Sequence, residues 1–479
     1  MEFKHERGNI LILFDKITQI PLLIAAVLLS LLKAKDFELQ VLLPILFLAL
    51  SPLVGIARYV STYYTIEKEL LIVETGIFNK KRLEIPLSKI TTVDLSQNIL
   101  YQLFKTYKIK ADNGSQAGGT AEKAEIVLAL KADKAFEFKR VLTQDTAPQI
   151  SQEENADETT ALSASFQDFI ILGLLQSKIA YFFAGGSIAL PVISAIAVLA
   201  TGSKDLDALL DKVFEQIPSA TAIFAVAAFF YFIALGISII RALFTYYHFR
   251  ISADADAVKV EYGLLNKKKF TLQKRKISGI LLKQNLLMRA FKCYTVEVSV
   301  MGYGHESGEE AHEQAILYPI ASMEKIKRIV RELLPEFDWE HPVHGPDRKA
   351  KRYFFYRPGF ILATLVFISV LFTKELILIV PAGGILAIAA IGVILQYRSA
   401  GIFCGKNNIV LSFGGYRKTI AVVKTARIES ITAKGSIFKR KKGIVSIELG
   451  FIAPLGTANI AAPNLPAEQY KLLENVIRY

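Results

Sequence analysis

Six stretches of the chain consist of apolar residues without charge, and apolar and polar positions alternate in much of the sequence between them. The apolar runs are Ile17–Leu32, Leu39–Ala57, Ile179–Ala200, Ser219–Ile240, Pro358–Thr373 and Leu376–Gln396. A helix that crosses a bilayer needs ~17–25 such residues. Each pair of runs is joined by a shorter connection than the one that follows it. We therefore expect six membrane spans, arranged as three helical hairpins.

Apolar runs of this kind have two other interpretations. Helices buried in a soluble core are also apolar, and the first run follows basic residues, as a signal peptide does. A central charge costs ~2.5–3.5 kcal/mol in a span, and these runs contain none. The exit of the first run, Lys33 to Lys35, offers no clean small-residue cleavage site. Both observations favour hairpins.

The distribution of charge predicts which side of the membrane the remaining segments occupy. The chain has 479 residues and a formal net charge of +13. Arg58, Arg241 and Arg398 each stand just beyond an even-numbered run. Because basic residues mark cytoplasmic segments, we expect a multi-pass protein of the cell membrane, with both termini and the β-rich segments in the cytoplasm. The presence of only two cysteines agrees with that compartment.

An internal repeat organises the β-rich segments. The residues Gly76–Lys81 match Gly263–Lys268 at an offset of 187, and the same offset relates Gln97-Asn98 to Gln284-Asn285 and Phe104-Lys105 to Phe291-Lys292. A fainter third copy is read from Gly415–Lys418, Arg427-Ile428 and Gly435–Phe438. Repeated matches at one offset predict three similar domains.

Each copy shows the pattern of strands followed by one helix. Strand-like runs are Leu70–Val73, Val258–Tyr262 and Ile409–Phe413, and helical patterns close the copies at Asp133–Leu142, Ser322–Leu334 and Pro466–Ile477. We expect Gly76, Gly263 and Gly415 at hairpin turns, because glycine reaches positive φ without steric cost. Each copy is predicted to be a small barrel or bent sheet plugged by its helix.

These features divide the chain into eight segments. They are the first hairpin (1–60), domain 1 (61–143), an acidic linker with an interfacial helix at Ala164–Ser177 (144–178), the second hairpin (179–243), domain 2 (244–335), a basic linker (336–357), the third hairpin (358–398) and domain 3 (399–479).

The series Gly76–Arg82, Ile85–Ile90 and Gln97–Leu100 resembles the bacterial pleckstrin-homology-like (PH-like) domain family, type two. The resemblance covers nearly the whole chain. It implies three cytoplasmic α+β PH-like domains, each a seven-stranded barrel capped by a C-terminal helix, beside the six spans. It also implies a shorter partner protein with one hairpin and one such domain. A glycine that commonly follows the Gln-containing segment in the family is replaced here by Lys105 and Lys292, and the third copy lacks the Gln.

Clusters of cations are the candidate binding residues. They are Lys80, Lys81 and Arg82; Lys267, Lys268 and Lys269; Lys274, Arg275 and Lys276; and Lys439, Arg440, Lys441 and Lys442. Near an anionic leaflet each contributes ~1 kcal/mol, so a cluster can hold a tethered domain on lipid. Solvated hairpin tips that merely support topology are the other interpretation. Nucleic acid is disfavoured, because the aromatic residues follow membrane belts and strand cores rather than a stacking platform.

Signs of catalysis are thin. His305, Glu306, Glu309, Glu310 and His312 fall in one hydrophilic loop, which favours a solvated surface over a metal site. No nucleotide-binding or nucleophile motif is present, and Cys293 lies in an apolar strand pattern. We expect no enzyme, metal or cofactor, and a membrane-anchored scaffold whose domains bind anionic headgroups or a partner protein. The alternative is a transporter or a lipid-translocating membrane protein with cytoplasmic regulatory domains, disfavoured because the runs contain no charged residue.

Overall fold

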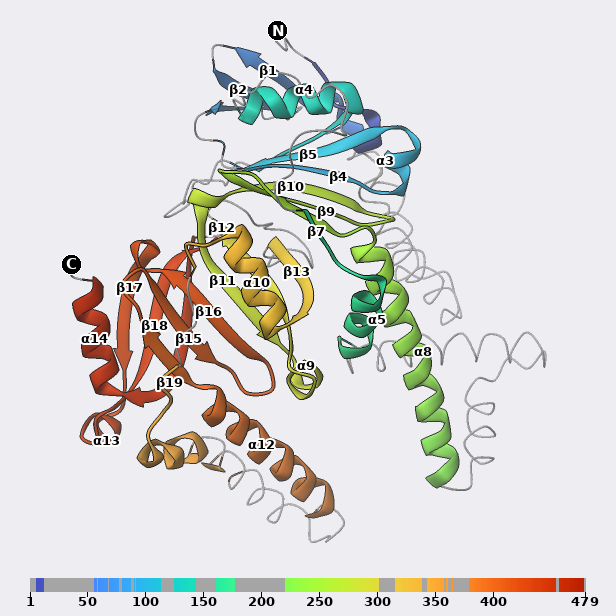
Figure 1. Cartoon of the computed structure of the whole chain (residues 1–479). Coiled ribbons are helices and arrows are strands. Elements are labelled where there is room, and N and C mark those ends of the chain that lie inside the picture. Colours follow the sequence, from blue (N-terminus) through green and yellow to red (C-terminus); the bar gives the residue numbers. More distant parts are fainter. Residues whose placement is uncertain are drawn as a thin grey trace, which may run out of the picture.

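Figure 1 shows the fold of the chain as a computed structural model. The structure describes residues 6–12, 56–57, 59–67, 69–76, 80–87, 90, 92–112, 125–143, 161–176, 220–300, 315–337, 343–356, 359–360, 364, 379–453 and 456–477. Within them, three similar units follow one another along the chain. Each unit has three strands, three more strands interrupted by a short helix, and a terminal helix.

The elements of unit 1 are β1 (Tyr63–Glu67), β2 (Leu70–Thr75), β3 (Lys81–Pro86), β4 (Thr92–Gln97), α3 (Ile99–Leu103), β5 (Thr106–Asp112), β6 (Glu125–Lys131) and α4 (Ala132–Thr143). A short strand and two helices precede the strands of unit 2: β7 (Ala161–Ser163), α5 (Phe166–Leu175) and α8 (Ala220–Tyr246).

The elements of unit 2 are β8 (Arg250–Ala253), β9 (Ala257–Tyr262), β10 (Lys267–Gln273), η3 (Lys274–Lys276), β11 (Ile277–Gln284), α9 (Leu286–Ala290), β12 (Cys293–Val300), β13 (Ala315–Ser322) and α10 (Met323–Leu333). The connection to unit 3 contains η4 (Arg348–Ala350) and α12 (Ile379–Ser399).

The elements of unit 3 are β14 (Gly401–Cys404), β15 (Asn408–Phe413), β16 (Lys418–Lys424), η6 (Thr425–Arg427), β17 (Ile428–Lys434), α13 (Ile437–Arg440), β18 (Ile444–Ala453), β19 (Gly456–Pro466) and α14 (Ala467–Ile477). The predicted strands at Leu70–Val73, Val258–Tyr262 and Ile409–Phe413 are confirmed, and so are the three terminal helices.

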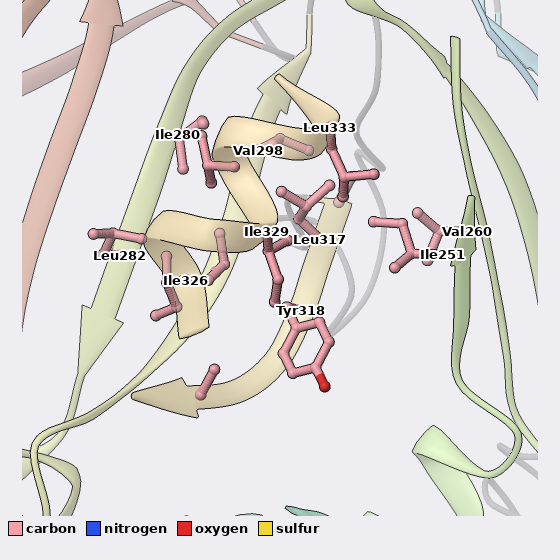
Figure 2. Close-up of a cluster of buried hydrophobic side chains, with 14 of the residues drawn as sticks. Ile251, Val260, Ile280, Leu282, Val298, Leu317, Tyr318, Ile326, Ile329 and Leu333 are labelled. Carbon is pink, nitrogen blue, oxygen red and sulfur yellow. The ribbon is translucent and has the colours of Figure 1, made fainter. Parts of the chain in front are cut away.

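The core of unit 2 shows how a unit is closed. Helix α10 begins at the N-cap Ser322 and lays its apolar stripe on the two sheets of the unit. Ile326, Ile329 and Leu333 are buried against side chains of both sheets, among them Val260 and Val298 (Figure 2). The buried face predicted for this helix from its periodicity is therefore confirmed. A Leu or Ile buried in this way contributes ~1.5–3 kcal/mol.

The sheets do not end at the boundaries of the units. Strand β4 of unit 1 pairs with β10 of unit 2, and β11 of unit 2 pairs with β16 of unit 3, both antiparallel. The described strands thus form sheets in the orders β1-β2-β3, β6-β5-β4-β10-β9-β8-β7, β13-β12-β11-β16-β15-β14 and β17-β18-β19. We call β4–β10 and β11–β16 the two joints. They link the units into one array (Figure 1).

The closed seven-stranded barrels implied by the family resemblance are therefore not what the described strands form. Each unit contributes two three-stranded sheets, and at each joint one of these sheets continues into the next unit. The physical reason is that an outer strand exposes unpaired N–H and C=O groups. A neighbouring unit satisfies these groups at each joint.

The six-span hairpin class predicted from the apolar runs is wrong. In the part of the chain that the structure describes, no helix is both long enough and apolar enough to cross a membrane. Runs Ile17–Leu32 and Ile179–Ala200 lie outside the described residues, as do most of Leu39–Ala57 and Pro358–Thr373. That prediction rested on the length, apolar character and lack of charge of the runs, and none of these properties shows what a helix packs against.

The two described runs belong to α8 and α12, which pack against the units. Helix α8 crosses α5 so closely that a Cβ on Gly173 would lie 2.5 Å from the Cα of Ile239, and the Ser238 hydroxyl donates to the Gly173 carbonyl (2.9 Å). In α12, Val393 is buried beside Phe354. Part of each apolar run is thus used for contacts within the protein.

The segment Ala164–Ser177, predicted to be an interfacial helix, contains helix α5, while its place at a membrane interface stays a prediction. Ser165 and Asp168 form a capping box at the start of α5. Its residues Phe169, Leu172 and Leu175 are buried in the core of unit 2. The end of the predicted acidic linker is structured as well, because β7 pairs with β8.

The turn glycines agree with the sequence in two units and differ by one residue in the third. Gly76 and Gly263 have φ of 102° and 110°. In unit 3 the matching residue is Gly414, with φ of 105°, and not the predicted Gly415. A Cβ on Gly414 would lie 1.9 Å from the Arg417 carbonyl oxygen, so only glycine fits this position.

A lysine stands in a left-handed conformation in units 1 and 2. Lys105 and Lys292 have φ of 47° and 55°, and Gly443 has φ of 68° at the same position of unit 3. These lysines were the departure from the family pattern noted in the sequence. A side chain costs ~1–2 kcal/mol in this conformation, whereas glycine costs nothing sterically but more chain entropy.

We expect Lys105→Gly and Lys292→Gly each to raise the free energy of unfolding by up to ~1 kcal/mol, because the left-handed strain exceeds the added entropy of the unfolded chain. Denaturant unfolding measures the change. Lys131→Gly, at an exposed strand position, is the matched control and should destabilise. Equal losses in all three variants would contradict the strain at Lys105 and Lys292.

Candidate functional site

Each unit carries a short helix on the connection between its fourth and fifth strands, and we call this connection the tip. The tips contain α3, α9 and α13. In units 1 and 2 an Asn begins the helix: the Asn98 and Asn285 side chains accept from the amides of Tyr101 and Met288, both at 2.8 Å. Such capping satisfies amides that the first turn leaves without a partner.

The glutamine of the repeated Gln-Asn pair holds the base of the tip. Gln97 Nε2 donates to the Thr106 carbonyl and Gln284 Nε2 to the Cys293 carbonyl, each at 2.8 Å. Both glutamines are buried. In unit 3 the position is Gly435, where a Cβ would lie 3.4 Å from the matching carbonyl of Ile444. The motif therefore supports the tip.

The first two helical residues of every tip are large, apolar and exposed. They are Ile99 and Leu100 in unit 1, Leu286 and Leu287 in unit 2, and Ile437 and Phe438 in unit 3. The last pair is the most open, with 71% and 76% of each residue exposed. Leu103, Phe104 and Phe291 enlarge the first two tips. Solvent-exposed apolar side chains that recur at the same position in every unit indicate an interaction surface.

The three tips lie on one side of the array. Figure 1 shows α3, α9 and α13 along the side toward which α8 and α12 extend, while α4 and α14 lie on the other side. The joints fix this arrangement through backbone ladders. In this view all three tips therefore lie on the same side of the array.

Cations surround the apolar residues of the third tip. Arg440, Lys441 and Lys442 are exposed. The Lys439 ammonium reaches the Asn464 side-chain oxygen (2.7 Å) and lies 5.9 Å from the ring centre of Tyr353. The contact with Tyr353 brings a second basic run to the tip, from exposed Arg348, Lys349, Lys351 and Arg352. Positive charge around exposed apolar groups suits an anionic surface.

The other predicted clusters have different surroundings. Lys80, Lys81 and Arg82 are exposed at the start of β3, and the Arg82 guanidinium pairs with Glu74 (3.4 Å) and Glu84 (2.8 Å). Lys267, Lys268 and Lys269 start β10 and lie within the first joint, opposite Gln97, Ser96 and Leu95. Their place in a ladder makes them part of the array.

The fourth group of basic residues, Lys274 to Lys276, forms η3 beside the second joint. The Arg427 guanidinium donates to the Arg275 carbonyl (2.7 Å) from unit 3. Burial lowers the pKa of Lys276, with Arg275 adding repulsion.

The structure thus brings together Lys439–Lys442 and the run 348–352, and it leaves the other three clusters apart. Sequence reasoning missed the exposed apolar pairs, although Ile99-Leu100 and Leu286-Leu287 repeat at offset 187.

Metal chemistry has no support in the described residues, which contain no group of three potential ligands. The loop with His305, Glu306, Glu309, Glu310 and His312 lies outside them. Both cysteines are free thiols and partly buried. Burial raises the pKa of Cys293 and raises the pKa of Cys404 to about 11.

Comparison with known proteins gives the family. The Bacterial PH domain family matches residues 12–146, 211–335 and 359–478. The chain belongs to this family. The three matches confirm both the repeat and the resemblance, although the domain boundaries drawn from the sequence stay a prediction.

One relative is the UPF0699 transmembrane protein YdbT of Bacillus subtilis (strain 168). It is 26% identical over 394 residues, which cover 80% of this chain and 78% of that protein. No solved structure matches.

The raised pKa of Cys404 predicts slow alkylation. At pH 8 a thiol of pKa 11 is ionised in roughly one molecule per thousand, and the thiolate is the reactive form. In a Cys293→Ser variant we expect iodoacetamide labelling of Cys404 to accelerate about tenfold per pH unit up to about pH 11. Mass spectrometry of the labelled chain measures the rate, with urea-unfolded protein as control. Rapid labelling of the folded chain at pH 8 would disprove the burial.

Proposed function

We propose that this protein is a membrane-associated scaffold whose three PH-like units contact the surface of an anionic bilayer through their tips. The observation that carries the proposal is the exposed apolar pair at the same place in all three units, on one side of the array. Association with a membrane also has support from the relative that is named a transmembrane protein.

The chemistry of the tips fits a lipid surface. Transfer of a Leu, Ile or Phe side chain out of water is worth ~1.5–3 kcal/mol, so one apolar pair gives several kcal/mol when it enters the headgroup region. The flanking Arg440, Lys441 and Lys442 add ~1 kcal/mol each near anionic lipid. The basic run 348–352 strengthens the third tip further.

The array supplies the scaffolding part of the proposal. Two joints hold three similar units in a fixed order, and this order gives a docking platform of constant geometry. The partners we propose are anionic lipids and a shorter member of the family with one PH-like domain. An enzymatic role has no observation in its favour.

Depth measurements test the contact with lipid. We expect a fluorophore on Phe438→Cys, in a Cys293→Ser and Cys404→Ser background, to be quenched by brominated acyl chains when the full chain is in phosphatidylglycerol vesicles, because the side chain at 438 enters the headgroup region. Fluorophores on Leu100→Cys and Leu287→Cys should behave alike, since all three tips face one surface. Quenching efficiency against bromine depth is the readout.

Leu472→Cys is the matched control. Leu472 is an apolar residue of α14 that is 51% exposed, and α14 lies on the other side of the array. Its fluorophore should remain unquenched. Equal quenching at 438 and 472, or none at 438, would reject the lipid contact. If a co-purified protein shields the fluorophore at 438 from the brominated chains, the tip binds a protein partner instead of lipid.

Electrostatics gives an independent test. Replacing Lys441 and Lys442 by Gln removes ~2 kcal/mol of attraction at most, so we expect the quenching at 438 to fall and its sensitivity to salt to weaken. Lys471→Gln on α14 is the charge control. Titration of phosphatidylglycerol into phosphatidylcholine vesicles measures the effect. If quenching in the double variant depends on salt as strongly as in the unsubstituted chain, these lysines have no role in the contact.

A further inference from the structure

The array ends in two outer strands that match the strands of its joints. Among the described strands, β3 is one of the two outer strands of the first sheet, beside β1 at the opposite edge, and β17 is one of the two outer strands of the last, beside β19. Strand β3 is the counterpart of β10 and β16, each of which accepts the preceding unit. Strand β17 is the counterpart of β4 and β11, each of which accepts the following unit. The two ends are therefore the two halves of a joint.

The two joints repeat one register. In each joint the residue before the start of the tip, Gln97 or Gln284, lies opposite the lysine four positions after the turn glycine, Lys267 or Lys418. A side chain from the tip then reaches the turn of the next unit. Gln102 donates to the carbonyls of Leu264 and Leu265 (3.0 Å each), and Arg289 donates to the carbonyl of Gly415.

Strand β3 carries the features of a strand that takes part in a joint. Its lysine four positions after the turn glycine Gly76 is Lys80, the start of a basic run that matches Lys267–Lys269. Arg82 pairs with Glu74, and at the same positions within the first joint Lys269 pairs with Glu261 (3.1 Å). Lysines at an edge commonly discourage pairing. In unit 2, however, the matching basic run Lys267–Lys269 pairs with β4 inside the first joint.

Strand β17 carries the features of the opposite half. Lys434 pairs with Glu448, and at the same positions within the second joint Lys283 pairs with Glu297 (2.5 Å). Arg440 occupies the position of Gln102 and Arg289, the fourth residue of the tip helix. The Arg440 guanidinium here donates to the Ala433 carbonyl of β17 itself (3.4 Å). The last unit thus presents a strand and an ion pair in the arrangement of the second joint, with a donor at the matching position of the tip.

We propose that β17 of one molecule pairs antiparallel with β3 of a second copy of this chain, which forms a third joint between molecules. The register of the two internal joints places Gly435 opposite Lys80, Lys434 opposite Lys81 and Ala433 opposite Arg82. The contact is head-to-tail, so it builds a ring or a linear array of copies. Pairing of strand edges between chains is a common mode of recognition.

One pair in this register carries like charge. Lys434 and Lys81 stand opposite each other, and like charges in that position destabilise a ladder. Glu448 neutralises Lys434 from the adjacent strand. The third joint is therefore weaker than the internal joints, which have Lys283 opposite Thr419 and Lys268 opposite Ser96. A weaker contact gives an assembly that depends on protein concentration.

Disulfide trapping tests the register. The full-length chain in mild detergent, with Cys293→Ser and Cys404→Ser, carries either Lys81→Cys or Lys434→Cys, both exposed positions. We expect a mixture of the two variants to form a covalent dimer on mild oxidation, because directly opposite residues have Cβ atoms ~4.5–5.5 Å apart. The chain with both substitutions should form a ladder of higher oligomers.

Two controls make the outcome decisive. Thr432→Cys, used in place of Lys434→Cys, is the control for register, because it lies two residues away on the same strand. Its yield of cross-linked dimer with position 81 should be at least fivefold lower. Cross-linking of Lys81→Cys with itself, or equal yields from 432 and 434, would overturn the proposal. Light scattering of the unmodified chain supplies a second measurement: a monomeric mass at every concentration would also overturn it.

Discussion

The unpaired backbone groups at the edges of β-sheets are the constraint on which the rest of the structure depends. A unit with two three-stranded sheets exposes outer strands, and each exposed strand invites association. The chain pairs β4 with β10 and β11 with β16, so that the partner of an outer strand comes from the adjacent repeat. The order and orientation of the units follow from ladders of hydrogen bonds rather than from the connecting segments.

The repeated sequence motif has a structural task that leaves the apolar side chains outside. Gln97 and Gln284 tie the two ends of the tip together, and Asn98 and Asn285 start the helix. A short helix fixed in this way presents its first two residues to solvent. The exposed apolar surface is thus maintained by buried polar contacts directly beneath it.

Local patterns in the sequence predicted local structure, and long-range contacts set the rest. The strands, the terminal helices and the buried stripe of α10 followed from periodicity, and the repeat followed from identities at one offset. The turn at Gly414 was misplaced by one residue, because the adjacent Gly415 is chemically the same. The shared sheets were not predictable, because the composition of a strand does not determine which strand it pairs with. The six spans were wrong because the apolar character of a run does not determine what its helix packs against, as the contacts of α8 with α5 and of α12 with Phe354 show.

Because neighbouring units share β-sheets, the three tips belong to one body, and this affects how strongly they can bind a common surface. Gln102 and Arg289 bridge from one unit to the next beside the ladders of the two joints. Three weak contacts on one body engage together at a high effective concentration. Such a body discriminates by shape: a surface whose curvature differs from the line of the tips meets fewer of them and is held far less tightly.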